Sequence, residues 1–200
     1  MEKNQLIPLK ECRNVDIKKD ITALHETGHV ITMYALGMMD HFKYVTIKAD
    51  NGTLALTEVT DEYKALMAKH SQDITEASLN MHSGKDITHT MQLSKPESAK
   101  LYFPNICRLF GGGAICRFYN VADEDMCKID YALIDTLLAG LGLTVKSNDI
   151  LQLVDQFLSS IFASFILLTK AIYTNLVKLG TLDKEQVMQI IKEWEEYKVL

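Results

Sequence analysis

Residues 23–30 read Ala23-Leu-His-Glu-Thr-Gly-His-Val30, and they lie inside a longer segment with helical periodicity. Between Asp16 and Leu36, five apolar or small residues follow one another at spacings of three or four, which places them on one buried stripe of a helix. They are Ile21, Leu24, Gly28, Ile31 and Ala35. We therefore predict a helix over Asp16–Leu36 that ends at Gly37, within a region that spans residues 15–37.

The pattern His25-Glu26-Thr27-Gly28-His29 within this helix is H-E-x-x-H. Residues four apart lie one turn apart on the same helix face, so both imidazoles can bind one Zn²⁺ at about 2.0–2.1 Å. Glu26 lies next to the first ligand and can take a proton from a zinc-activated water. The pattern predicts His25 and His29 as zinc ligands and Glu26 as the catalytic base. The alternative is that these residues form the solvated face of an amphipathic helix.

A catalytic zinc ion usually has three protein ligands and one open position. His41 follows Gly37 and borders a predicted hairpin, while His82 and His89 lie in a polar segment. Several acidic residues fall on or near a predicted helix, and spacing alone does not choose among them. These candidates are Asp123, Glu124, Asp125, Asp130 and Asp135.

Two short strands are predicted after the first helix. Tyr44–Lys48 and Thr53–Val59 have strand-like composition, and Asp50-Asn51-Gly52 between them is typical of a hairpin turn. An extended substrate could pair with the edge of the second strand, which makes its residues candidates for substrate binding. These residues are Thr53, Leu54, Ala55, Leu56 and Thr57. A polar insertion over residues 60–96 follows, with a helix near Glu62–Lys69.

The rest of the chain is predicted to be helical. A helix over Ser98–Tyr119 contains Gly111-Gly-Gly113, and because glycine is costly in a helix, we expect the close approach of a neighbouring backbone there. Further helices are predicted over Asp123–Leu141 and, as one long element, Asp149–Leu179.

Gly180 should end that long helix. Asp183 and Gln186 resemble a capping pair for a last helix towards Tyr197, so that residues 147–200 form C-terminal helices. Residues 1–200 are thus predicted to form a single mainly α domain with one small β-hairpin or sheet.

Composition limits the classes of function. The chain has 200 residues, 48% of them hydrophobic, and a formal net charge of −5 with no long basic run, which argues against nucleic-acid binding. Serines interrupt the most apolar stretch, Phe157–Leu168, so we expect no membrane span. Four cysteines form no C-x-x-C pair and suggest reduced thiols in a cytoplasmic protein; they are Cys12, Cys107, Cys116 and Cys127.

In its motifs and their order, the sequence resembles the peptidase domain of the FtsH family of ATP-dependent zinc proteases. Ala23–Val30 is similar to the family's H-E-A-G-H-A helix, and Val45–Ile47 and Gly52–Thr57 are similar to its V-T-I and G-x-A-L-G-x-T strands. Ile106–Ala114 is similar to L-L-G-G-R-A-A, and Leu176–Asp183 to L-L-E-x-E-T-L-D. The resemblance covers most of the chain from Asp16 onward and implies a helical, zincin-like fold.

The resemblance also implies a third zinc ligand. In the family this is an aspartate on the helix after the Gly-Gly-Arg-Ala-Ala segment, and carrying the register forward from Gly111 places it on Asp130. The implied function is a zinc-dependent endopeptidase with a polypeptide substrate, and the family's hexamers make a homo-oligomer compatible with it. The family's ATPase module and membrane anchor are not seen in this sequence, nor is a Walker-type loop, so we expect hydrolysis of unfolded or flexible polypeptides without ATP.

Two other functions stay open at the level of sequence. Cys116 and Arg117 replace the acidic pair that usually follows Ala-Ala in the family, and residues 60–96 are longer than the usual connection. A catalytically silent zinc-binding module that binds a protein partner through this insertion is the first alternative. A helical domain without metal is the second. Glu26 favours the enzyme, because a structural zinc site would not need a base and usually has four protein ligands.

Overall fold

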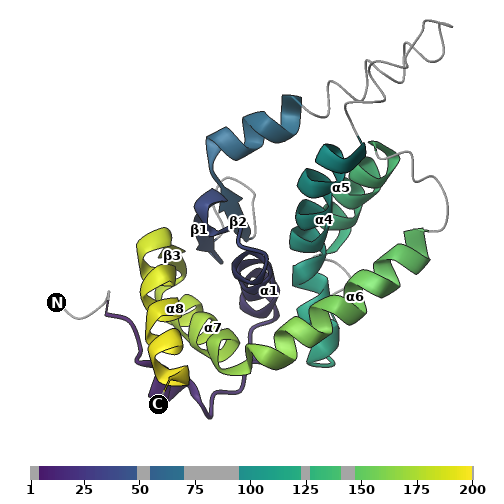
Figure 1. The fold of residues 1–200 in the computed structure, drawn as a ribbon. Helices are drawn as coiled ribbons and strands as arrows, with labels where there is room; N and C mark the ends of the chain where they lie inside the picture. The colour runs from purple at the N-terminus through teal and green to yellow at the C-terminus, as the bar shows by residue number, and fades with distance from the viewer. Residues whose placement is uncertain (1–4, 49–54, 70–94, 123–126, 141–146, 200) are drawn as a thin grey trace, which may run out of the picture.

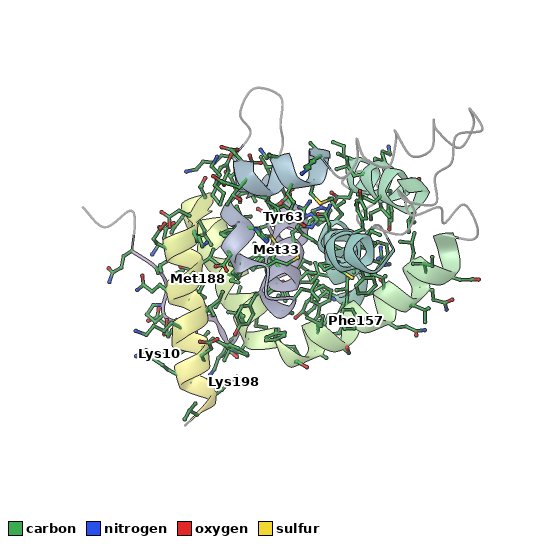
Figure 2. The ribbon with its side chains drawn as sticks, turned by 45° about the horizontal axis from the view of Figure 1, so that its top comes forward. Lys10, Met33, Tyr63, Phe157, Met188 and Lys198 are labelled. Atoms are coloured by element: carbon green, nitrogen blue, oxygen red, sulfur yellow. The ribbon has the colours of Figure 1, made fainter. Side chains whose placement is uncertain are left out.

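The computed structural model describes residues 5–48, 55–69, 95–122, 127–140 and 147–199. They form a mainly helical protein with one small sheet, as predicted, and this sheet is antiparallel with three strands (Figure 1). Helix α1 (Ile21–Ala35) lies in the middle, with the sheet on one side and α4 (Lys95–Phe118) on the other. Met33 of α1 and Tyr63 lie towards the centre of the molecule, whereas Lys10 and Lys198 lie at its margin (Figure 2).

Helix α1 is buried along most of its length, which a helix surrounded by other elements requires. It begins at Ile21 and not at Asp16 as predicted. Asp20 has an extended backbone (φ −125°, ψ 99°), and its side chain accepts a hydrogen bond from the backbone N–H of Ala23, so it is the N-cap. The helix ends at Ala35, with Leu36 as its C-cap, and Gly37 follows with a positive φ of 69°.

Helices α1 and α4 approach each other at glycines, which confirms the prediction for the glycine-rich segment. A Cβ added at Gly28 would lie 2.4 Å from the carbonyl oxygen of Gly111. One added at Gly111 would lie 2.5 Å from Oγ1 of Thr32 and 2.9 Å from the carbonyl oxygen of Gly28. Because no real Cβ fits at such distances, this crossing requires glycine on both helices.

Helix α4 leads to α5 (Cys127–Gly140), which agrees with the later part of the predicted helix over Asp123–Leu141; residues 123–126 lie outside the described residues. Residues 61–69 are helical, in agreement with the helix predicted near Glu62–Lys69. The last helix, α8 (Lys184–Lys198), begins with a capping box formed by Asp183 and Gln186, as predicted.

The prediction of one helix over Asp149–Leu179 is wrong. The segment forms α6 (Ser147–Ser164) and α7 (Ile166–Leu179), with a bend of 84° between them. The backbone of Phe165 is not helical (φ −117°, ψ 22°). The centroid of its ring lies 5.1 Å from that of the Trp194 ring and 5.6 Å from that of the Tyr34 ring. The Ser164 hydroxyl donates to the Ser160 carbonyl at 3.0 Å, a bond that favours bending. Gly180 caps α7 with φ 76°, as predicted.

In the described part of the chain, no single helix is long and apolar enough to cross a membrane. The bent pair α6 and α7 reaches that length and apolar content only when both helices are taken together.

The sheet has the strand order β2-β1-β3, with β1 (Phe42–Thr46) in the centre. Strand β2 (Leu56–Val59) pairs with β1 in antiparallel orientation, in which Val45 faces Thr57. Strand β3 (Thr181–Asp183), which was not predicted, pairs with the other side of β1. Within the described residues, strand β2 is therefore an edge strand of the sheet, as the substrate-binding hypothesis needs. Thr53, Leu54 and the predicted Asp50–Gly52 turn lie outside the described residues.

Candidate metal centre

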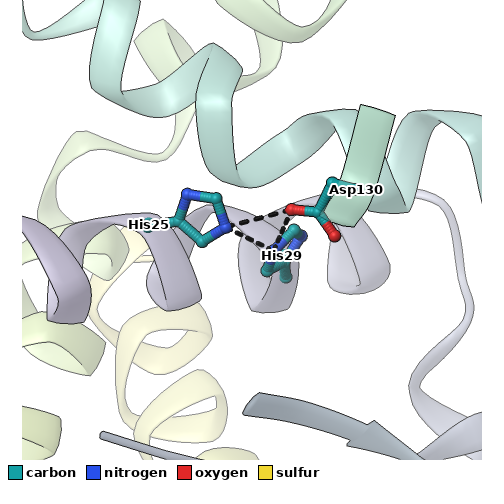
Figure 3. Close-up of side chains that lie close together, drawn as sticks. All are labelled: His25, His29 and Asp130. Atoms are coloured by element: carbon teal, nitrogen blue, oxygen red, sulfur yellow. Dashed lines mark hydrogen bonds and ion pairs between the residues drawn. The ribbon is translucent and has the colours of Figure 1, made fainter. Parts of the chain in front are cut away.

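The two histidines of α1 meet an aspartate of α5 in one cluster (Figure 3). Nε2 of His25 lies 3.0 Å from Nε2 of His29 and 3.1 Å from Oδ2 of Asp130. Nε2 of His29 lies 3.4 Å from the same oxygen. Three atoms with metal-binding chemistry therefore converge on one point.

The spacing fits one small cation. Two atoms bound to zinc at about 2.05 Å in tetrahedral geometry lie about 3.3 Å apart, and the three observed separations are 3.0, 3.1 and 3.4 Å. Both histidines are buried, and the Asp130 side chain is 17% exposed. Among the described residues, this is the group of His, Cys, Asp and Glu side chains whose ligand atoms come together in this way.

The orientation of His29 is set by α4. Its Nδ1 lies 2.7 Å from the backbone oxygen of Arg108. Because a carbonyl only accepts hydrogen bonds, Nδ1 must carry the proton and donate it, which leaves the Nε2 lone pair for a metal. A second hydrogen bond of this kind fixes the tautomer and raises the basicity of metal-bound histidines.

The orientation of His25 depends on the absence of a side chain at Gly112. A Cβ at Gly112 would lie 2.4 Å from Nε2 of His25 and 2.6 Å from its Cε1. The imidazole therefore lies directly against the backbone of α4. The glycine-rich segment thus has two roles. Gly111 allows the close approach of α1, and Gly112 leaves room for the ring of His25, one candidate ligand.

Electrostatics in the cluster favour an ionised Asp130. Burial by itself would raise the pKa of this carboxyl group. In the absence of a metal, the charge of a protonated His29 and hydrogen bonds from both imidazoles hold that pKa well below its ordinary value. An ionised carboxylate is the form that binds a metal. The cluster therefore combines two nitrogen donors with one anionic oxygen donor, a set that zinc accepts in catalytic sites.

Glu26 follows His25 on α1 and is buried, with 5% of its surface exposed. Its Oε2 accepts a hydrogen bond of 2.6 Å from the hydroxyl of Thr57 on β2. The predicted base and one of the predicted substrate-binding residues are thus in direct contact. Ala55 and Leu56, the other described residues of that set, are half-buried, whereas Thr57 is buried.

Arg108 is a charged residue near the cluster that sequence reasoning missed. Its Nε donates a hydrogen bond of 2.9 Å to Oδ1 of Asn105, and its side chain is half-buried. Burial lowers the pKa of Arg108, while the negative charges of Asp130, Glu26 and Glu58 raise it. The guanidinium therefore lies within electrostatic reach of both carboxylates of the site. Arg108 lies one helical turn from Asn105 in an apolar helix, and the sequence around it contains no motif that would have predicted a charged residue near the site.

The remaining candidates lie elsewhere. Asp135 is exposed, and His41 stacks on Tyr63 with ring centroids 4.4 Å apart. Cys116 is buried, and Arg117 donates a hydrogen bond of 2.7 Å to Asp155 of α6. Five candidates lie outside the described residues: His82, His89, Asp123, Glu124 and Asp125.

No protein-family model matches this chain, and no curated protein sequence matches it.

Proposed function

We propose that this protein is a zinc-dependent endopeptidase of the FtsH peptidase type, with a zincin-like fold, that hydrolyses unfolded or flexible polypeptides without ATP. The observation that carries the proposal is the convergence of Nε2 of His25, Nε2 of His29 and Oδ2 of Asp130 beside a buried glutamate. These three atoms would hold the ion. A bound zinc ion polarises a carbonyl group and lowers the pKa of a coordinated water to about 7.

Glu26 supplies the proton transfer that hydrolysis needs. As the water oxygen bonds to the carbonyl carbon of the substrate, the Glu26 carboxylate takes one proton from the water. The protonated Glu26 then gives this proton to the amide nitrogen, and the carbon–nitrogen bond breaks. The second proton of the water also passes to the amine nitrogen, so the products are a carboxylate and a protonated amine, and Glu26 returns to its ionised form. General acid–base help of this kind contributes about 10²–10⁴-fold to a rate.

The edge strand β2 supports a polypeptide substrate. A sheet edge pairs with an extended peptide through backbone hydrogen bonds, and Thr57 of this strand contacts Glu26. A peptide that adds to β2 would therefore lie near the base. The same geometry requires an extended backbone, which unfolded or flexible segments provide.

The first test compares the wild type with Glu26→Gln. Each purified protein is measured for bound zinc and for cleavage of casein, with a zinc chelator and restoration by added zinc as controls. We expect one zinc ion per chain in both proteins, and about 10²–10⁴-fold slower cleavage by the variant, because an amide cannot accept the proton. Equal rates would remove Glu26 from the mechanism.

Two other outcomes separate the alternative functions. A wild type that binds zinc and cuts no polypeptide would favour the catalytically silent module that binds a protein partner. A wild type that binds no zinc would favour the helical domain without metal.

A further inference from the structure

The contact between Thr57 and Glu26 joins the base to the sheet. Thr57 Oγ1 lies 2.6 Å from Oε2 of Glu26 and 3.4 Å from its backbone oxygen. A threonine hydroxyl has one proton to donate. The shorter distance and the carboxylate charge both favour Oε2, because hydrogen bonds to ionised acceptors are shorter and stronger than neutral ones.

The contact is shielded from water. Thr57 is 6% exposed and Glu26 is 5% exposed. Among the described residues, no second side chain donates a hydrogen bond to the Glu26 carboxylate. Without Thr57, no described side chain would hydrogen-bond to the carboxylate and fix the rotation of the carboxylate group about its terminal bond. That torsion has a broad intrinsic distribution.

We propose that Thr57 is a positioning residue, which holds the Glu26 carboxylate with Oε2 engaged so that Oε1 faces the attacking water. The inference rests on the proposed function and deepens it. Thr57 belongs to edge strand β2, so one residue joins the strand that receives the substrate to the base that acts on it. The sheet then aligns the substrate and the proton acceptor together, which is the geometric condition for a fast intramolecular step.

The kinetic test uses three variants and a peptide substrate derived from casein. Thr57→Val keeps the shape of the side chain and its suitability for a strand but removes the hydroxyl, while Thr57→Ser keeps the hydroxyl. Thr46→Val is the matched control on β1, because the hydroxyl of Thr46 bonds to Thr181 and to the carbonyl oxygen of Gly180 and does not contact Glu26.

We expect Thr57→Val to lower kcat by about 10–100-fold, since small misplacements cost up to about 10²-fold, with KM and zinc content within about threefold of wild type. Thr57→Ser should restore most of kcat, and Thr46→Val should keep it. In a Glu26→Gln background, Thr57→Val should cause no further loss. A wild-type kcat for Thr57→Val, or a Thr57→Ser variant as slow as Thr57→Val, would overturn the proposal.

A second readout does not depend on activity. Crystal structures of the wild type and of Thr57→Val should show one Glu26 conformation in the former and more than one in the latter. The same Glu26 conformation in both would overturn the positioning role. Should the wild type bind zinc and cut nothing, the proposed function would fail, and the crystal structures would still decide whether Thr57 positions Glu26.

Discussion

Asp130 approaches the two histidines from a helix that is distant in sequence, 105 residues after His25. In the proposed site, replacing Asp130 would remove one of three metal contacts, and even outer partners of metal ligands contribute about 10–100-fold to affinity. We therefore expect Asp130→Ala to weaken zinc binding by at least about tenfold. Competition with a chromogenic chelator measures this affinity.

Asp135→Ala is the matched control for Asp130→Ala, because Asp135 lies on the same helix with an exposed side chain. It should bind zinc like the wild type. Equal losses in the two variants would show that α5, and not the Asp130 carboxylate, determines affinity.

The His25 ring lies against the backbone at Gly112, so Gly112→Ala should lower the zinc affinity more than the stability of the fold. The added methyl group would lie 2.4 Å from Nε2 of His25, and this ring can rotate away. Alanine also has a higher helix propensity than glycine by about 1 kcal/mol. We expect a folded protein, by circular dichroism, whose zinc affinity falls by about tenfold or more. Wild-type zinc affinity in this variant would contradict the role of Gly112.

The contact between helices α1 and α4 is the element-scale feature on which the site depends. Gly28→Ala would place a methyl group 2.4 Å from the carbonyl oxygen of Gly111, and a backbone atom inside a helix cannot rotate away. Overpacking of this kind costs about 1–3 kcal/mol or more, which exceeds the gain in helix propensity of about 1 kcal/mol. Chemical denaturation should show a lower free energy of unfolding, and an unchanged or higher value would contradict the close-packing argument.

At the scale of the whole molecule, the prediction concerns the folded state of the substrate. Global unfolding of a stable domain costs about 5–15 kcal/mol, and the sequence contains no Walker-type loop that would bind ATP to supply this energy. We expect cleavage of casein, little cleavage of a stable folded domain, and no effect of ATP on either. Gel electrophoresis of both substrates, with and without ATP and with a chelator control, measures this. Cleavage of the folded domain that ATP stimulates would contradict it.

Local patterns explain why several elements could be predicted. The helical stripe of α1, the Gly180 cap and the Asp183–Gln186 capping box depend on neighbours within a few residues, and all three are present. The start of α1 was predicted too early, because the apolar stripe does not show that the Asp20 side chain caps the helix. Strand β3 was not predicted, because three residues are too few to show the alternation of apolar and polar residues that identifies a strand.

The residue pattern alone places His25 and His29 on one helix face, because residues four apart in a helix are neighbours, and Glu26 follows His25 directly. The spacing left the third acidic residue undecided, and the resemblance to a known family alone favoured Asp130. Only the tertiary structure brought Asp130 to the histidines, placed Thr57 on Glu26 and bent the chain at Phe165. The physical reason is that these contacts join segments far apart in sequence, and their geometry depends on how closely the helices and the sheet pack.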